Sequence, residues 1–142
     1  MVIRLLPAQI SKIWDYIRYG LISVPSPIMD TTPEALRNIL RSLLGGELQC
    51  WIVSNNSEVH GYALTTIAED NISKSKFLNI YDIFAFRELT KETSADMISA
   101  LKEFAKANNC KKITAYSNIV KIVGLAEAHG FNSDIRFLIL EV

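Results

Sequence analysis

The sequence predicts an α/β (α+β) domain in which a central mixed β-sheet is flanked by helices. Two periodicities predict this class: apolar residues spaced three and four apart, as in amphipathic helices, and apolar residues alternating at every second position, as in strands. Their order along the chain is β-α-α-β-β-β-α-β-α-β. With 142 residues, 49% hydrophobic and 21% charged, the chain has the size and composition of one globular domain. We therefore expect a single domain over residues 1–142.

The first third of the chain predicts one strand and two helices. Residues 2–6 alternate as a short strand does, and the apolar side chains of residues 10–17 recur at helical spacing. Thr32 and Pro33 are typical of a helix N-cap and of the first helical position, and Gly46 is typical of a helix end. The second helix is therefore expected to run from Pro33 to the glycines.

The middle of the chain predicts strands. Residues 48–54 and 59–67 read as the two arms of a hairpin. Residues 77–86 are apolar on both alternating faces apart from Asn79 and Asp82, which is typical of a central strand covered on both sides.

The last third predicts a helix, a strand, a second helix and a final strand, over residues 94–107, 112–117, 119–129 and 135–142. Thr93, with Asp96 three positions later, resembles a capping box for the first of these helices. Because a right-handed crossover joins parallel strands, we expect strands 77–86 and 112–117 to be parallel neighbours that diverge at one end.

The periodic positions also predict the core. We expect ten side chains to be mostly buried: Trp14, Leu36, Leu40, Trp51, Ile80, Phe84, Leu101, Phe104, Ile113 and Phe137.

Composition disfavours several classes of function. The 15 basic and 15 acidic residues balance, whereas nucleic-acid binders usually carry a basic excess, so no nucleic acid is expected as a partner. No apolar run is long enough for a bilayer and no secretory signal is visible, so we expect no membrane partner and a cytoplasmic location. Cys50 and Cys110 read as buried thiols, and no residues have metal-ligand spacing, so no metal is expected.

Several segments resemble one family in the order that its fold requires. Residues 50–63, with Gly61-Tyr62-Ala63 on the return strand, are similar to its second hairpin, and residues 78–86 to its central fourth strand. Residues 103–113 are similar to the end of its third helix and the start of its fifth strand. Residues 126–131 are similar to its fourth helix and Gly-Phe corner. The family is the GNAT (general N-acetyltransferase) superfamily.

This resemblance implies an N-acetyltransferase that uses acetyl-CoA as co-substrate and acetylates an amine acceptor. In the family, the strand backbone after the fourth strand's midpoint holds the pantetheine arm, and the following loop and helix N-terminus hold the phosphates. Carried over to this sequence, the cofactor-binding positions are Ile83, Phe84, Ala85, Phe86, Arg87, Lys91, Glu92, Thr93, Ser94 and Asn118.

The sequence departs from the family pattern at two places. The loop motif [QR]-x-x-G-x-[GA] falls on Leu89, Glu92 and Ser94, which places a carboxylate where a glycine should approach phosphate, so Arg87 or Lys91 would have to supply the positive charge. The phenol that protonates the leaving thiolate falls on Ala126. Tyr116, on the preceding strand, could take its place.

Other residues allow two interpretations. Asp82 is either a base with a raised pKa or a hydrogen-bonded polar residue where the central strands part. Asn118 either orients the CoA arm or caps the next helix. His129 is expected to complement the end of its helix, and His60 to lie on a sheet face.

Two functions therefore remain open from the sequence. One is the acetyltransferase, with Asp82 and Tyr116 as catalytic residues. The alternative is a catalytically inactive GNAT-fold module that binds a partner or has a structural role, as among small phage-encoded proteins, because the phosphate loop and the phenol are both missing.

Overall fold

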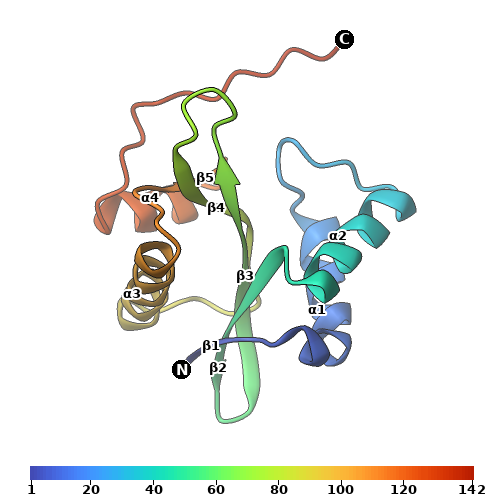
Figure 1. The fold of residues 1–142 in the computed structure, drawn as a ribbon. Coiled ribbons are helices and arrows are strands. Elements are labelled where there is room, and N and C mark those ends of the chain that lie inside the picture. Colours follow the sequence, from blue (N-terminus) through green and yellow to red (C-terminus); the bar gives the residue numbers. More distant parts are fainter.

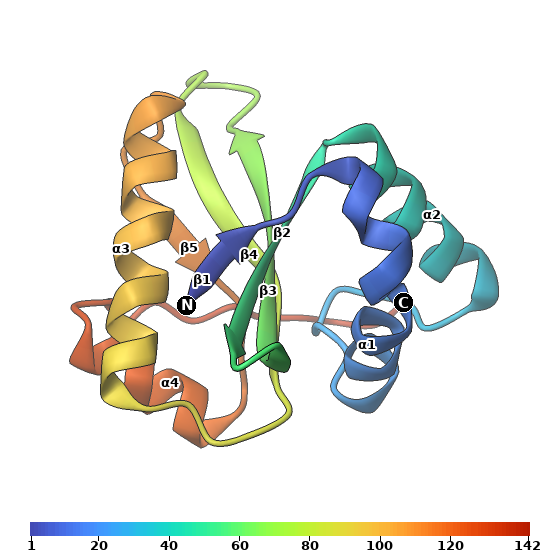
Figure 2. The ribbon, with the colours of Figure 1, turned by 90° about the horizontal axis from the view of Figure 1, so that it is seen from below.

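Five strands and four helices form three layers in the computed structural model, which describes all 142 residues. Helices α1 and α2 cover one face of the sheet, and α3 and α4 cover the other (Figures 1 and 2). The elements are β1 (Val2–Arg4), a short 3₁₀ turn (Pro7–Gln9), α1 (Ile10–Ser23), α2 (Pro33–Gly45), β2 (Leu48–Asn55), β3 (Glu58–Glu69), β4 (Lys76–Ala85), α3 (Lys91–Ala107), β5 (Ile113–Ala115) and α4 (Val120–Ala128).

The sheet has the order β1-β2-β3-β4-β5. The first four strands are antiparallel to their neighbours, whereas β5 runs parallel to β4. Helix α3 makes the crossover between β4 and β5, so the predicted parallel pair is confirmed. The predicted mixed sheet flanked by helices is confirmed with it.

The core is divided in two by the sheet. On the α1 and α2 side, Ile17 and Leu43 pack on Tyr62 and Leu64 of β3. On the α3 side, Leu101 packs with Trp51 and its neighbours. Thr32 caps α2 by accepting a hydrogen bond from the N–H of Ala35, as the sequence predicts.

Most of the predicted core is confirmed. Leu36, Trp51, Ile80 and Leu101 are buried, and five more are half-buried within the two clusters: Trp14, Leu40, Phe84, Phe104 and Ile113. The prediction for Phe137 is wrong, because its side chain is 53% exposed.

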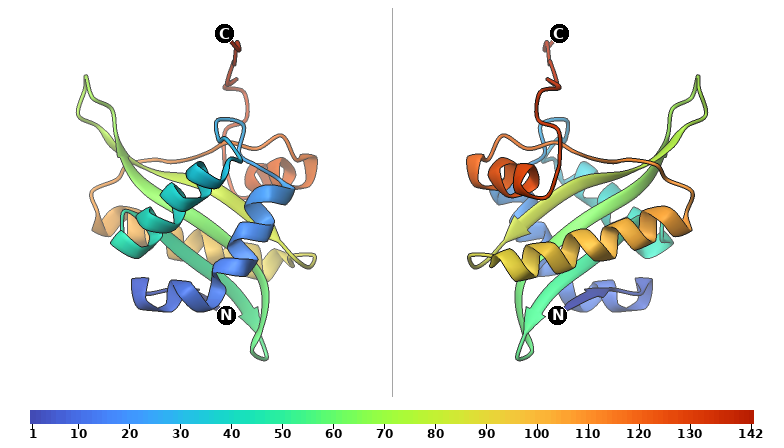
Figure 3. Two further views of the ribbon diagram at one scale, coloured as in Figure 1. Left: turned by 90° about the vertical axis from the view of Figure 1, so that its right-hand side faces the viewer. Right: turned by 90° about the vertical axis from the view of Figure 1, so that its left-hand side faces the viewer.

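The predicted last strand over residues 135–142 does not form. This segment is exposed and extends away from the body of the molecule (Figure 3). Its one aromatic contact joins Phe137 to Tyr116, with ring centroids 4.7 Å apart. β5 pairs over only three residues, so its open edge offers few backbone partners to a further strand.

Helix α3 begins earlier than the sequence predicts. It starts at Lys91 rather than at Ser94, and Thr90 rather than Thr93 is its N-cap. The Thr90 hydroxyl accepts from the N–H of Thr93, so the cap sits three residues upstream of the predicted capping box. The connection between β4 and α3 is consequently short. None of the helices is both long and apolar enough to cross a membrane.

Candidate functional site

Strands β4 and β5 part after a short parallel ladder. Leu78, Asn79 and Ile80 pair with β5, but β4 continues to Ala85 without a partner on that side. A register shift in the ladder with β3 marks the same place: Leu64 lies opposite Asp82 and Thr65 opposite Ile80. Such a bulge bends a strand and increases its twist. The shift therefore occurs where β4 separates from β5.

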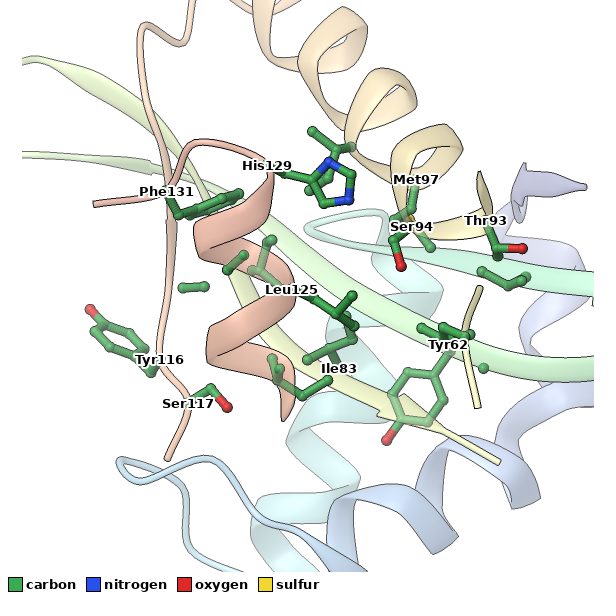
Figure 4. A pocket seen from close by; sticks show the side chains of 18 residues that line it. Tyr62, Ile83, Thr93, Ser94, Met97, Tyr116, Ser117, Leu125, His129 and Phe131 are labelled. Carbon is green, nitrogen blue, oxygen red and sulfur yellow. The ribbon is translucent and has the colours of Figure 1, made fainter. Parts of the chain in front are cut away.

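An apolar cavity of about 80 Å³ lies beside this separation, between β4, α3 and α4. Thirteen of its 18 lining residues are hydrophobic. Ile83 of β4, Met97 of α3, and Leu125 and Phe131 from α4 and the segment after it line it (Figure 4). A crevice at the carboxyl end of parallel strands is where open α/β sheets bind ligands. The lining suits an uncharged, flexible chain rather than an ion.

Asp82 lies on the opposite face of β4 from Ile83 and is 7% exposed. Its Oδ2 accepts a hydrogen bond of 2.7 Å from the hydroxyl of Tyr62, and that hydroxyl also lies 3.2 Å from the carbonyl oxygen of Ile17. Burial raises the pKa of Asp82 to about 6, although the Tyr62 hydroxyl and the backbone N–H of Ile83 favour the carboxylate. The pKa of Tyr62 is raised as well, by burial and by the neighbouring carboxylate. Asp82 is thus ionised near neutral pH and able to accept a proton.

One N–H group at the N-terminus of α3, that of Thr93, is occupied by the helix's own cap. The N–H of Thr93 donates to Thr90 Oγ1 at 3.1 Å, and both the N–H and the hydroxyl of Ser94 donate to the Thr90 carbonyl at 3.0 Å. Only the N–H groups of Lys91 and Glu92 stay free in the first turn. Thr93 and Ser94 nevertheless line the cavity with their side chains.

Comparison with solved structures decides the fold. A predicted acetyltransferase from Clostridium acetobutylicum, with acetyl-CoA, is 18% identical, covers 99% of this chain and 95% of its own, and superposes with a TM-score of 0.75. This chain has the GNAT acetyltransferase fold. A provisionally named acetyl transferase from Pyrococcus furiosus is 26% identical over 100% of this chain and 99% of its own, with a TM-score of 0.71. A GNAT family acetyltransferase from Staphylococcus aureus is 14% identical, covers 100% of this chain and 98% of its own, and has a TM-score of 0.67. No family model and no curated protein sequence matches the chain.

The charged residues proposed for phosphate binding in this GNAT fold are dispersed. Arg87 forms an ion pair with Glu58 on the hairpin, and Glu58 also lies 3.8 Å from Nε2 of His60. Lys91 and Glu92 are exposed on the first turn of α3 and do not line the cavity. Among the predicted charges, Lys91 alone is a free cation beside the free N–H groups.

The segment predicted to hold the pantetheine arm directs its side chains to both faces of β4. Ile83 lines the cavity, whereas the rings of Phe84 and Phe86 pack on the α1 side. Phe86 follows the end of β4, and its N–H donates to the carbonyl of His60, so it is bound to β3. Of the four residues predicted to hold the pantetheine arm, residues 83–85 therefore lie on the part of β4 that has no partner on its β5-facing edge.

Tyr116 and Asn118 lie in the segment that follows the end of β5 at Ala115. Tyr116 lines the cavity, but its hydroxyl points away from the other labelled side chains (Figure 4). Asn118 is exposed and does not cap α4, because Ile119 is the N-cap and its N–H donates to Ser117 Oγ. The helix-cap interpretation of Asn118 is wrong.

His129 is a site residue that the sequence analysis did not include. It ends α4, as expected, but its ring points towards α3 in the direction of Met97 and Ser94 (Figure 4). Its Nε2 is buried without a hydrogen-bond partner, and the residue lines the cavity. The sequence does hold a signal for this role. His129 is three residues from Ala126, the position of the family's phenol, and this spacing places both residues on one face of α4. No group of three or more His, Cys, Asp or Glu residues could hold a metal ion.

Proposed function

We propose that this protein transfers an acetyl group from acetyl-CoA to the nitrogen of an amine. The observation that carries the proposal is the parting of β4 and β5 beside an apolar cavity, with Asp82 on the other face of the same strand. The open edge of residues 83–85 offers strand-like hydrogen bonds to the amide groups of the pantetheine arm. The solved structure from Clostridium acetobutylicum has the same fold and holds acetyl-CoA.

In the proposed reaction the lone pair of the amine attacks the thioester carbonyl carbon. A C–N bond forms, the C–S bond breaks, and CoA leaves as a thiolate. Asp82 accepts the proton that the nitrogen loses, since its carboxylate is ionised above a pKa of about 6. His129, with its unpartnered Nε2 in the cavity, replaces the absent phenol as the donor that protonates the thiolate.

A second candidate is a GNAT-fold module without catalysis, and the α3 N-terminus favours it. Thr90 occupies the N–H of Thr93, Glu58 neutralises Arg87, and Glu92 adds a negative charge. Each of these features weakens binding of a pyrophosphate. A protein of this kind would keep the fold and bind no CoA.

Calorimetric titration with acetyl-CoA and with free CoA separates the two candidates. The acetyltransferase requires saturable heat, which Leu125→Trp should abolish by filling the cavity. Val120→Trp is the matched control, because Val120 lies on the same helix and is 85% exposed. No heat from the wild type with millimolar acetyl-CoA would leave the inactive module as the function.

A further inference from the structure

Residues 135–142, which we call the apolar segment, are largely unpacked in their own domain. Ile135, Leu138 and Leu140 are 81%, 88% and 87% exposed. The ring of Phe137 contacts Tyr116, and the segment extends away from the body of the molecule (Figure 3). Contiguous exposed apolar surface marks an interaction site more often than isolated exposed residues do.

The pattern of the apolar segment is that of a strand covered on both faces. Apolar side chains occupy both alternating sets of positions, and only Arg136 and Glu141 are charged. A single strand is not stable in water, because its backbone groups and its apolar side chains both need a sheet beside them. The segment can therefore become a strand only at an open sheet edge.

Strand β5 offers such an edge. It is the last strand in the order of the sheet and pairs with β4 alone, so its other side carries no strand. An open edge of this kind is a template for pairing with another chain. Ala115 and Tyr116, at the end of β5, also line the apolar cavity. A strand added at this edge therefore lies beside the candidate site.

The lengths and charges of the two segments match. Residues 138–142 span about 17 Å as a strand, as do residues 111–115. Antiparallel pairing of these two ranges places Glu141 opposite Lys112. Both side chains are exposed, and neither forms an ion pair within its own chain. Parallel pairing of the same ranges places Ile139 opposite Lys112 instead, so the charges favour the antiparallel arrangement.

We propose that two copies of this chain exchange their apolar segments. Residues 138–142 of each copy pair in the antiparallel sense with residues 111–115 of the other, so a two-fold axis closes the dimer. The exchange forms two ladders in one complex, and the second ladder forms within a complex that the first already holds together. Because acidic and basic residues balance, two copies do not repel each other through net charge. The proposal is independent of the proposed function, because association is measured without acetyl-CoA.

Sedimentation equilibrium of the full chain tests the association. We expect a reversible dimer that Leu140→Asp weakens about a hundredfold, because this change places a charge in a buried strand. Ile72→Asp is the matched control, since Ile72 is 93% exposed on the loop between β3 and β4. A wild type that stays monomeric at submillimolar concentration, with the segment free or paired with its own β5, would overturn the proposal. So would a dimer that Leu140→Asp leaves unchanged.

Charge reversal tests the register and the exchange between copies. Glu141→Lys and Lys112→Glu should each weaken its own dimer about tenfold, because like charges then face each other at both ladders. An equimolar mixture of the two variants should form a heterodimer as tight as the wild-type dimer, because opposite charges face each other again at both ladders. Pairing of the segment within one chain cannot respond to mixing.

Two further proteins complete the charge-reversal test. The double variant with both changes in one chain should dimerise as the wild type does. Glu34→Lys reverses an exposed charge on α2 and serves as the control, with no effect expected on the dimer. If neither the mixture nor the double variant recovers the affinity, the exchange of strands in this register is wrong.

Discussion

The hydroxyl of Tyr62 lies 2.7 Å from the carboxylate of Asp82, and the same hydroxyl lies 3.2 Å from the carbonyl oxygen of Ile17. The single phenolic proton can serve only one of these acceptors at a time. When Asp82 is ionised, Tyr62 donates to it. When Asp82 is protonated, its own O–H can donate to Tyr62, which frees Tyr62 to donate to Ile17. The pair can therefore take up and release a proton without leaving a buried polar group unpaired.

The first prediction concerns the pH dependence of the reaction. As a general base, Asp82 acts only when ionised, so its contribution to kcat/KM should rise with pH through about 6 and then level off. Asp82→Asn should lower kcat/KM by about a hundredfold or more at pH 7 and lose this inflection. Protonation of the amine affects the wild type and Asp82→Asn equally, so the ratio of their kcat/KM values at each pH reports on Asp82 alone. A ratio that does not vary with pH would contradict the role of base.

The second prediction concerns stability. A pKa raised from 3.8 to about 6 means that the folded state holds the Asp82 proton more tightly than the unfolded state. The stability from this group is complete below pH 3.8 and is lost as pH rises through about 6, by up to about 3 kcal/mol. Asp82→Asn should therefore be more stable than wild type at pH 7, but not at pH 3.5. Urea unfolding at pH 7 and pH 3.5 measures the free energy of unfolding of both proteins. The same difference in stability between variant and wild type at the two pH values would refute the prediction.

The third prediction concerns the first turn of α3. If CoA phosphates bind there, Glu92→Gln should tighten CoA binding by about 0.5–1 kcal/mol, because it removes an exposed like charge. Lys91→Ala should weaken binding by a similar amount. Asp96→Asn changes an exposed charge one turn further along α3 and serves as the control. Calorimetric titration in low salt gives the three affinities, and no response to either first-turn change would place the phosphates elsewhere.

The fourth prediction concerns His129. If its Nε2 protonates the leaving thiolate, His129→Phe should lower kcat at least tenfold with little change in the Kd for acetyl-CoA. His129→Gln keeps an N–H donor but cannot transfer a proton, so it should lower kcat as much as His129→Phe does. A structural role alone would make Gln and histidine equivalent in rate.

Repeating patterns made most of the fold predictable. The nearly continuous apolar run of residues 77–86 and the amphipathic spacing of the helices are local properties, and the buried faces of these elements follow from them. The strand over residues 135–142 failed because alternation shows only that a strand could form. Whether one forms depends on the length of the neighbouring edge, and β5 pairs over only three residues.

The candidate site was harder to predict because its contacts join distant parts of the chain. The polar interruption at Asp82 was visible in the sequence, but its partner Tyr62 lies 20 residues away and depends on the bulge in β4. The start of α3 was misplaced because Thr93, with Asp96 three positions later, resembles a capping box as well as Thr90 resembles an N-cap. The aromatic contacts between α1 and the end of β4 also join elements that no local spacing brings together.

The last prediction tests how tightly the base is held. Gly20 of α1 is buried against Tyr62, and a Cβ atom there would lie 2.7 Å from Cε2 of the ring. Gly20→Ala should displace the ring and lengthen its hydrogen bond to Asp82, at a cost of about 1–3 kcal/mol from overpacking. The pH at which the Asp82 contribution to kcat/KM levels off should then rise, because the carboxylate loses a donor. Gly45→Ala is the control, since a Cβ there has no neighbour closer than 3.9 Å. An unchanged profile in Gly20→Ala would show that Tyr62 does not tune Asp82.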